Sequence, residues 1–243
     1  MKRNFLSVHD EPAFSAQAQA DPSETNAATL HPQEEIDTIR DSVLNEPHFG
    51  DSARPEAFRD WVAAKRAGTT RGGSLLLTIA AGLLAGPFAV LGAFAAGNPT
   101  LFAVVYIILF GPVIEELLKQ SGMIYLLERR PYRIFAGWQF PLAAVLAALI
   151  FASIENFLYI YQFSSVTNDT ARVAEFAMFR WKVCTALHVG CAIVASFGLR
   201  RVWQEQTRTG RPADLSLAFP LVTAAIVIHG VYNLIALFLT DLF

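Results

Sequence analysis

Five apolar stretches of membrane length constrain the fold more than any other feature of the sequence. Each holds roughly the 20 residues that a helix needs to cross a bilayer. A soluble globular domain is therefore excluded for the C-terminal two thirds, and we predict an all-α, polytopic integral membrane helix bundle over residues 71–243. The five predicted spans are Ser74–Ala96, Leu101–Leu127, Phe140–Phe163, Phe176–Leu199 and Leu217–Leu239.

Residues 1–70 form a polar tail that contrasts with this apolar region. We predict disorder over residues 1–33, which lack the apolar residues that a packed core requires. Two short amphipathic helices are predicted at Glu34 to Leu44 and at Pro55 to Ala67. The second helix suits either the membrane surface or plain solvent. The formal net charge of −2 gives no reason to expect a nucleic-acid partner.

The basic residues between the apolar stretches are distributed unevenly between the two sides of the membrane. They cluster before the first stretch, after the second and after the fourth, whereas the other connections hold one basic residue, Arg172. The positive-inside rule therefore predicts a cytoplasmic N-terminus and an external C-terminus. Arg180 and Lys182, near the outer end of the fourth stretch, run against this assignment. The clusters are Lys65, Arg66 and Arg71; Arg129, Arg130 and Arg133; Arg200, Arg201, Arg208 and Arg211.

Two adjacent carboxylates and a lysine interrupt the second apolar stretch, at Glu115, Glu116 and Lys119. Ionisable groups at membrane depth are costly and normally mark a functional interior. Pro112 cannot donate a backbone hydrogen bond, so the helix is predicted to kink or restart there. A restart would place both glutamates in a first turn, near the positive helix end. A buried glutamate–lysine pair is the structural alternative, and it would explain only one of the two glutamates.

The later stretches also carry polar residues: Glu155, His188, His229 and Asn233. Glu115, His188 and His229 each lie within about one residue of the middle of their predicted span, or ~1.5 Å of helical rise. Glu155 lies about 5 Å from its own midpoint. Given helix tilt, Glu115, Glu155 and the two histidines can meet in one layer. Each histidine or asparagine taken singly is equally typical of an interhelical hydrogen bond.

The chemistry of this layer admits a metal site. The three glutamates exceed Lys119 by two negative charges, which a divalent cation would offset. Two neutral imidazoles and a carboxylate are the ligands of many hydrolytic zinc sites. A further glutamate can then take a proton from water, and Asn233 can donate to an oxyanion. A proton relay through the same residues remains open at this point.

Four segments, in order, resemble the PrsW family of intramembrane metalloproteases, which is related to the CAAX-prenyl-protease and bacteriocin-processing membrane proteins. The resemblance spans Leu101 to Leu239 and implies a polytopic bacterial membrane protease that cleaves membrane-associated protein, as when family members start the degradation of an anti-sigma factor. In the CAAX-protease relatives a histidine occupies the position of Glu155. The four segments are Pro112–Lys119, with the paired glutamates; Phe151–Tyr159, with Glu155; His188; and His229–Asn233.

We therefore predict a membrane-embedded metallopeptidase of the bacterial inner membrane that acts on a membrane-associated protein substrate within the lipid bilayer. Glu155, His188 and His229 are expected to bind the metal, Zn²⁺ being the expected ion. Glu115, Glu116 and Asn233 are expected to be catalytic. The alternatives are a proton- or cation-coupled transporter, for which buried glutamates and histidines are also typical, and a catalytically inactive membrane binding protein.

Overall fold

The computed structural model describes residues 55–93 and 104–239, all of which belong to one compact unit, Pro47–Phe243. Every regular element of these residues is helical, which confirms the predicted fold class. The predicted disordered segment 1–33, the predicted helix from Glu34 to Leu44 and the C-terminal Phe243 lie outside the described residues. The elements are α3 (Pro55–Ala67), α4 (Arg71–Ala93), η5 (Tyr106–Phe110), α6 (Gly111–Arg129), η6 (Pro131–Arg133), α7 (Gln139–Val166), α8 (Thr170–Phe179), η7 (Arg180–Cys184), α9 (Thr185–Thr209), η8 (Leu215–Ala218) and α10 (Phe219–Leu239).

Four helical stretches of the described residues are long and apolar enough to cross a membrane: Arg71–Val90, Gln139–Val166, Thr170–Thr209 and Leu215–Phe238. They correspond to the first, third, fourth and fifth predicted spans. The second predicted span corresponds to η5 and α6, which form one continuous helical run. This run differs from the four apolar stretches because it contains Glu115, Glu116 and Lys119.

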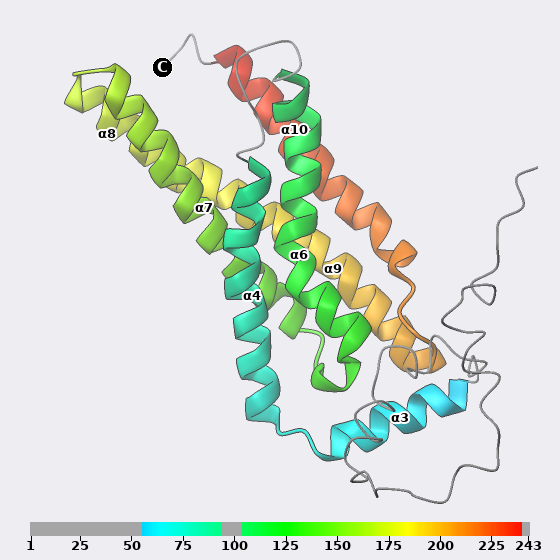
Figure 1. Ribbon diagram of the computed structural model, residues 1–243. Coiled ribbons are helices and arrows are strands. Elements are labelled where there is room, and N and C mark those ends of the chain that lie inside the picture. Colours follow the sequence, from blue (N-terminus) through cyan, green and yellow to red (C-terminus); the bar gives the residue numbers. More distant parts are fainter. Residues whose placement is uncertain (1–54, 94–103, 240–243) are drawn as a thin grey trace, which may run out of the picture. The chain divides into compact units, whose positions relative to one another are not determined.

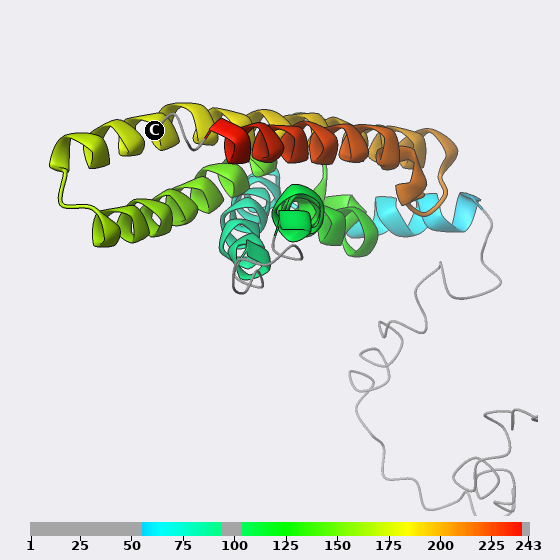
Figure 2. The same cartoon turned by 90° about the horizontal axis from the view of Figure 1, so that it is seen from above.

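Helix α6 lies at the centre of the bundle, in contact with α4, α7, α9 and α10. Figure 2 shows α9 and α10 side by side in one layer, with α4, α6 and α7 in a second layer. Glu115, Glu116 and Lys119 are buried on the side of α6 that faces these helices, whereas Leu117 and Tyr125 on its other side are exposed. This central position explains how a helix that carries two glutamates and a lysine is accommodated at membrane depth.

The helices pack closely through small residues. A side chain on Gly122 of α6 would place its Cβ 2.4 Å from the carbonyl oxygen of Ala81 in α4, and one on Gly86 of α4 would lie 2.7 Å from that of Ala147 in α7. Large apolar side chains such as Leu84 and Phe157 face outward, with exposed fractions of 73% and 66%. Small residues inside and large apolar residues outside are the pattern of helices that pack in lipid.

Helix α3 has the bounds that the sequence predicts, and it packs against the connection after α6. Phe58 is buried, and the ring of Trp61 meets that of Tyr132 edge-on, with centroids 5.7 Å apart. The guanidinium of Arg66 donates to the carbonyl oxygen of Ile134 at 3.0 Å. The apolar face of α3 is therefore used for packing on the helical unit.

Candidate metal and catalytic site

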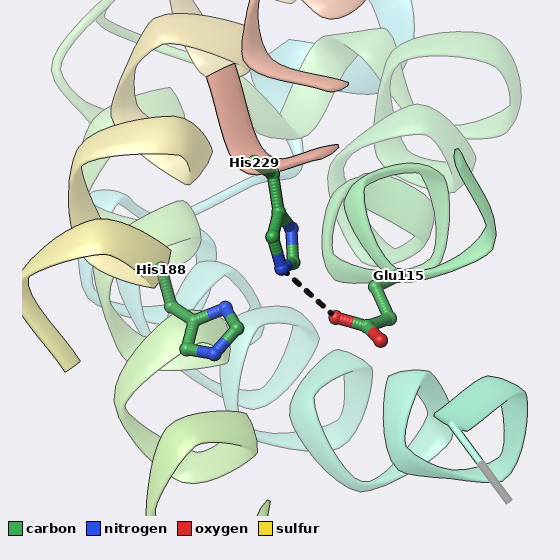
Figure 3. Close-up of side chains that lie close together, drawn as sticks. All are labelled: Glu115, His188 and His229. Atoms are coloured by element: carbon green, nitrogen blue, oxygen red, sulfur yellow. Dashed lines mark ion pairs between the residues drawn. The ribbon is translucent and has the colours of Figure 1, made fainter. Parts of the chain in front are cut away.

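Three side chains from three helices converge inside the bundle: Glu115 of α6, His188 of α9 and His229 of α10. One potential ligand atom of each lies within 4.8 Å of the others, and Figure 3 shows the carboxylate and both rings pointing toward a common space. Their exposed fractions are only 6%, 3% and 2%. The predicted meeting of these three residues in one layer is thus observed.

Glu116 orients the ring of His229. His229 Nδ1 lies 2.9 Å from Glu116 Oε1. Since a carboxylate can only accept, the proton resides on Nδ1. His229 Nε2 is then left with its lone pair, and it lies 3.7 Å from Glu115 Oε2. A histidine that donates one ring N–H to a carboxylate and keeps the other nitrogen free is the usual arrangement of a metal-binding histidine.

Glu155 orients the ring of His188 through its other ring nitrogen. The ammonium of Lys119 lies 3.2 Å from His188 Nδ1 and can only donate, so this nitrogen is the acceptor. The proton therefore resides on Nε2, which lies 2.9 Å from Glu155 Oε2. Unlike His229, His188 thus has both ring nitrogens engaged, and Nδ1 becomes available to a metal only if Lys119 releases it. Glu155, expected from the sequence to bind the metal together with the histidines, contacts His188 but is not one of the three convergent residues.

Lys119 is the buried cation of the site. Its ammonium lies 2.7 Å from Glu116 Oε1, and neither side chain is exposed. It also sits over the ring of Phe151, 4.4 Å from the centroid, which adds a cation–π contact. The predicted glutamate–lysine pair therefore exists, and Glu116, three residues before Lys119, is the partner. Glu115 has no such partner and turns toward the histidines.

A second ion pair lies at the rim of the site. The guanidinium of Arg180, in the π-helical turn η7, donates to Glu155 Oε2 at 2.9 Å and to Asn156 Oδ1 at 3.0 Å. It also stacks over the ring of Tyr159. Its side chain and that of Glu155 are 11% and 13% exposed, more than those of the convergent residues. The side of the site formed by Glu155 and Arg180 is therefore its more exposed side.

Two buried carboxylate oxygens are left without a hydrogen-bond partner: Glu115 Oε2 and Glu116 Oε2. Buried oxygens of this kind are rare, and an unaccounted ion is one ordinary explanation. The donor set of one carboxylate and two imidazoles matches that of hydrolytic zinc sites. On both counts the side chains present fit a divalent metal.

The turn that leads into α6 is π-helical, and Pro112 explains why. The N–H of Gly111 bonds to the carbonyl oxygen of Tyr106, five residues back, instead of that of Ile107. Pro112 has no N–H to offer to Ile108. The backbone nevertheless stays helical through Phe110, so the predicted kink or restart takes the form of a π turn. The restart that would place both glutamates in a first turn does not occur, because the helical run begins earlier.

Helix α10 packs against the two carbonyl oxygens released by this turn. The amide of Asn233 donates to the carbonyl oxygen of Ile107 at 2.9 Å. Gly230 lies so close to the carbonyl of Ile108 that a Cβ would be 2.4 Å from its oxygen. His229, Gly230 and Asn233 therefore act together: one turn of α10 presents the imidazole, and its neighbours fix that turn against the start of α6. Asn233 was expected to contact a reaction intermediate, and in the structure its amide is bound to the backbone.

Sequence reasoning did not identify Arg180 as a member of the site. Arg180 lies near the outer end of a predicted span, where the positive-inside rule does not expect a basic residue. An arginine within a membrane-length helix requires an anionic partner, and Glu155 lay one span earlier at a similar depth. That requirement was the available signal.

The comparisons with known proteins are consistent with this geometry. The profile described as "PrsW family intramembrane metalloprotease" matches residues 66–243. The matched range contains α4 to α10 and every residue of the site. No curated protein and no solved structure gives a significant match.

Proposed function

Because this chain belongs to the PrsW family of intramembrane metalloproteases, we propose that it hydrolyses a peptide bond of a membrane-associated protein substrate. The observation that carries the proposal is the convergence of Glu115, His188 and His229 inside the bundle. We place the enzyme in a bacterial inner membrane and propose a protein of the anti-sigma-factor kind as its substrate.

Glu115, His188 and His229 are the residues that would hold the metal, for which we propose Zn²⁺; His188 would bind through Nδ1, which requires Lys119 to release its hydrogen bond to that nitrogen. When bound, such an ion lowers the pKa of a water molecule and polarises a carbonyl group. We assign the carboxylate ligand to Glu115 because its Oε2 has no hydrogen-bond partner, whereas Glu155 Oε2 already accepts from Arg180 and from His188. Glu155 then acts by fixing the ring of His188.

Glu116 is the residue that we propose to move the proton. Its Oε1 is bound by Lys119 and His229, whereas its Oε2 is unpartnered and can accept a proton from water. The same oxygen would return this proton to the leaving amine of the cleaved peptide bond. Lys119 keeps a positive charge beside Glu116 in both states, which limits the charge left in low dielectric.

Asn233 is assigned a positioning role. Its hydrogen bond to Ile107 sets the π turn that precedes Glu115, while His229 lies one turn earlier on the same helix. The pair of contacts therefore fixes how far Glu115 stands from His229. The side-chain amide of Asn233 has a second N–H. This group could donate to an oxyanion while the first N–H stays bonded to the carbonyl oxygen of Ile107.

The experiment that tests the proposal is cleavage of a membrane-tethered reporter by the purified chain in liposomes. We expect cleavage by the wild type, loss on chelation, and restoration by added Zn²⁺. His229→Ala should be inactive, whereas Gln204→Ala, an exposed polar residue of α9 remote from the site, should cleave as the wild type does. Cleavage that persists in His229→Ala would contradict the proposal.

A proton- or cation-coupled transporter is the second candidate, and one observation favours it. A continuous chain of polar contacts runs from Arg180 through Glu155, His188, Lys119 and Glu116 to His229. Such chains also serve as proton relays. Proton uptake into liposomes that is lost in Glu155→Gln, with no cleavage of any reporter, would favour transport over proteolysis.

A further inference from the structure

Basic residues gather at one end of the helical unit. Figure 1 shows the start of α4, the end of α6, the end of α9 and the start of α10 on the lower side, beside α3. The charges at these points are Arg59, Lys65, Arg66, Arg71, Arg129, Arg130, Arg133, Arg200, Arg201, Arg208 and Arg211. Positive charge at one end of a membrane bundle attracts anionic lipid headgroups in general. A specific site requires in addition a cavity that fits one.

A cavity of about 360 Å³ lies at this end, between α9 and α10. Its polar wall is formed by Arg200, Arg201 and Gln204, and its apolar wall by Val194, Phe197 and Leu221. None of the described residues that line it is a carboxylate. Glu205, the acidic residue next to Gln204 on α9, is engaged with Arg208 at 2.6 Å. The two arginines of the cavity are therefore not neutralised by a lining acid.

Arg200 is held in place with part of its hydrogen-bonding capacity unused. Its side chain packs on Gly137, where an added Cβ would lie 2.7 Å from the guanidinium Nε. That Nε is buried and has no hydrogen-bond partner. Arginine presents its N–H groups in a planar fork that matches the oxygens of a phosphate. Because Nε is enclosed beside Gly137, a phosphate in the cavity would be bound by the terminal N–H groups of the Arg200 guanidinium and not by Nε.

By the spans predicted from the sequence, the cavity lies at the depth where lipid phosphates and the upper acyl chains meet. Arg200 directly follows the predicted fourth span, Phe176–Leu199. Leu221 lies four residues inside the fifth span and Val194 five residues inside the fourth, or roughly 6–8 Å below the span ends. Its charged wall therefore stands at headgroup level, and its apolar wall stands at the level of the first methylenes.

From these observations we infer that the cavity between α9 and α10 binds the headgroup and upper acyl chain of an anionic phospholipid. Two arginines without a lining carboxylate select for negative charge, and basic pockets between helices at this level are suited to such headgroups. The apolar wall distinguishes a lipid from a free phosphate ester. This site is separate from Glu115 and the histidines and does not depend on the proposed protease activity.

The test is a lipid titration of the purified full-length chain in mild detergent, read by native mass spectrometry. The probes are dioleoylphosphatidylglycerol and, as the uncharged comparison, dioleoylphosphatidylcholine. We expect the wild type to retain the anionic lipid preferentially. Arg201→Gln, at an exposed position where folding is not at risk, should weaken its retention on the order of tenfold, the scale of one charge-assisted hydrogen bond. Arg200→Lys should weaken it as well, since it keeps the charge and loses the fork.

Arg211→Gln is the matched control, because it removes one exposed positive charge at the same end and outside the cavity. It should retain the anionic lipid as the wild type does. Equal loss in Arg211→Gln and Arg201→Gln would show a diffuse charge effect and overturn the site. Displacement of the lipid by an equal concentration of glycerol phosphate would identify a free phosphate ester as the ligand and overturn the lipid assignment.

Discussion

The side-chain amide of Asn233 in α10 donates a 2.9 Å hydrogen bond to the carbonyl oxygen of Ile107, in the π-helical turn that leads to Glu115. This carbonyl is released because the N–H of Gly111 bonds to Tyr106 instead. A side chain thus replaces the hydrogen bond that the helix gives up. It does so one turn away from His229, so the contact links the proposed carboxylate ligand to a proposed imidazole ligand.

Asn233→Ala is expected to lose stability and metal as well as activity. Without the amide, the Ile107 carbonyl loses its partner, at a cost of about 1–3 kcal/mol, and α10 is no longer fixed against the start of α6. Thermal unfolding in detergent and zinc content per chain are the measurements. A variant that unfolds and binds zinc as the wild type does, yet fails to cleave, would instead make Asn233 a donor to the reacting oxygen.

The Glu116–Lys119 pair is expected to behave as a coupled buried ion pair. Glu116→Gln alone should destabilise the fold by about 3–5 kcal/mol, because Lys119 stays buried without its counter-charge. Lys119→Met alone should have a similar effect. The double variant Glu116→Gln/Lys119→Met should be less destabilised than either single variant, as a thermal double-mutant cycle would show. Additive losses would mean that the two side chains do not interact in the folded protein.

Much of the fold was predictable from the sequence because the membrane leaves few choices. Long apolar stretches must be helical in lipid, since every backbone group is then bonded within its own segment. The approximate positions of the spans followed from this pattern, and the bounds of α3 followed from its amphipathic sequence. Glu115, His188 and His229 each lie near the middle of their own predicted span, and this position indicated their common depth.

The partners of the charged residues were not predictable from spacing alone. Glu115 and Lys119, four residues apart, share a helix face, yet the ammonium of Lys119 pairs with Glu116. The choice depends on where His188 and His229 stand, and these come from helices that the sequence cannot orient. The π turn could not be predicted either, because Pro112 requires an irregularity in the helix but does not determine its form. The contact of Glu155 with Arg180 likewise depends on how the fourth span is rotated, which the sequence does not specify.

The N-terminal segment is expected to be dispensable for the chemistry. Every residue of the proposed site lies between Tyr106 and Leu239, and the packed helix α3 begins only at Pro55. Deletion of residues 2–54 should leave cleavage of a membrane-tethered reporter within about twofold of the wild type, at equal insertion and expression. Complete loss of cleavage under those conditions would place the segment within the mechanism.

The basic end of the bundle is expected to face the cytoplasm, by the positive-inside rule. Reporter fusions after Arg133 and after Arg211 should therefore give a cytoplasmic signal, and a fusion at Phe243 an external one. An external signal from the Arg133 fusion would reverse the orientation. It would also move the lipid cavity between α9 and α10 to the other leaflet.

Zinc content per chain measures whether Glu115 and the two histidines hold a metal. We propose to measure zinc in detergent-purified Glu115→Ala and Glu155→Ala, with Gln204→Ala as the control. We expect Glu115→Ala to lose the metal and the control to keep it. Glu155→Ala should bind about 10–100-fold more weakly, as expected for a residue that orients a ligand. Full zinc occupancy in Glu115→Ala, with complete loss in Glu155→Ala, would contradict the account and restore Glu155 as the carboxylate ligand.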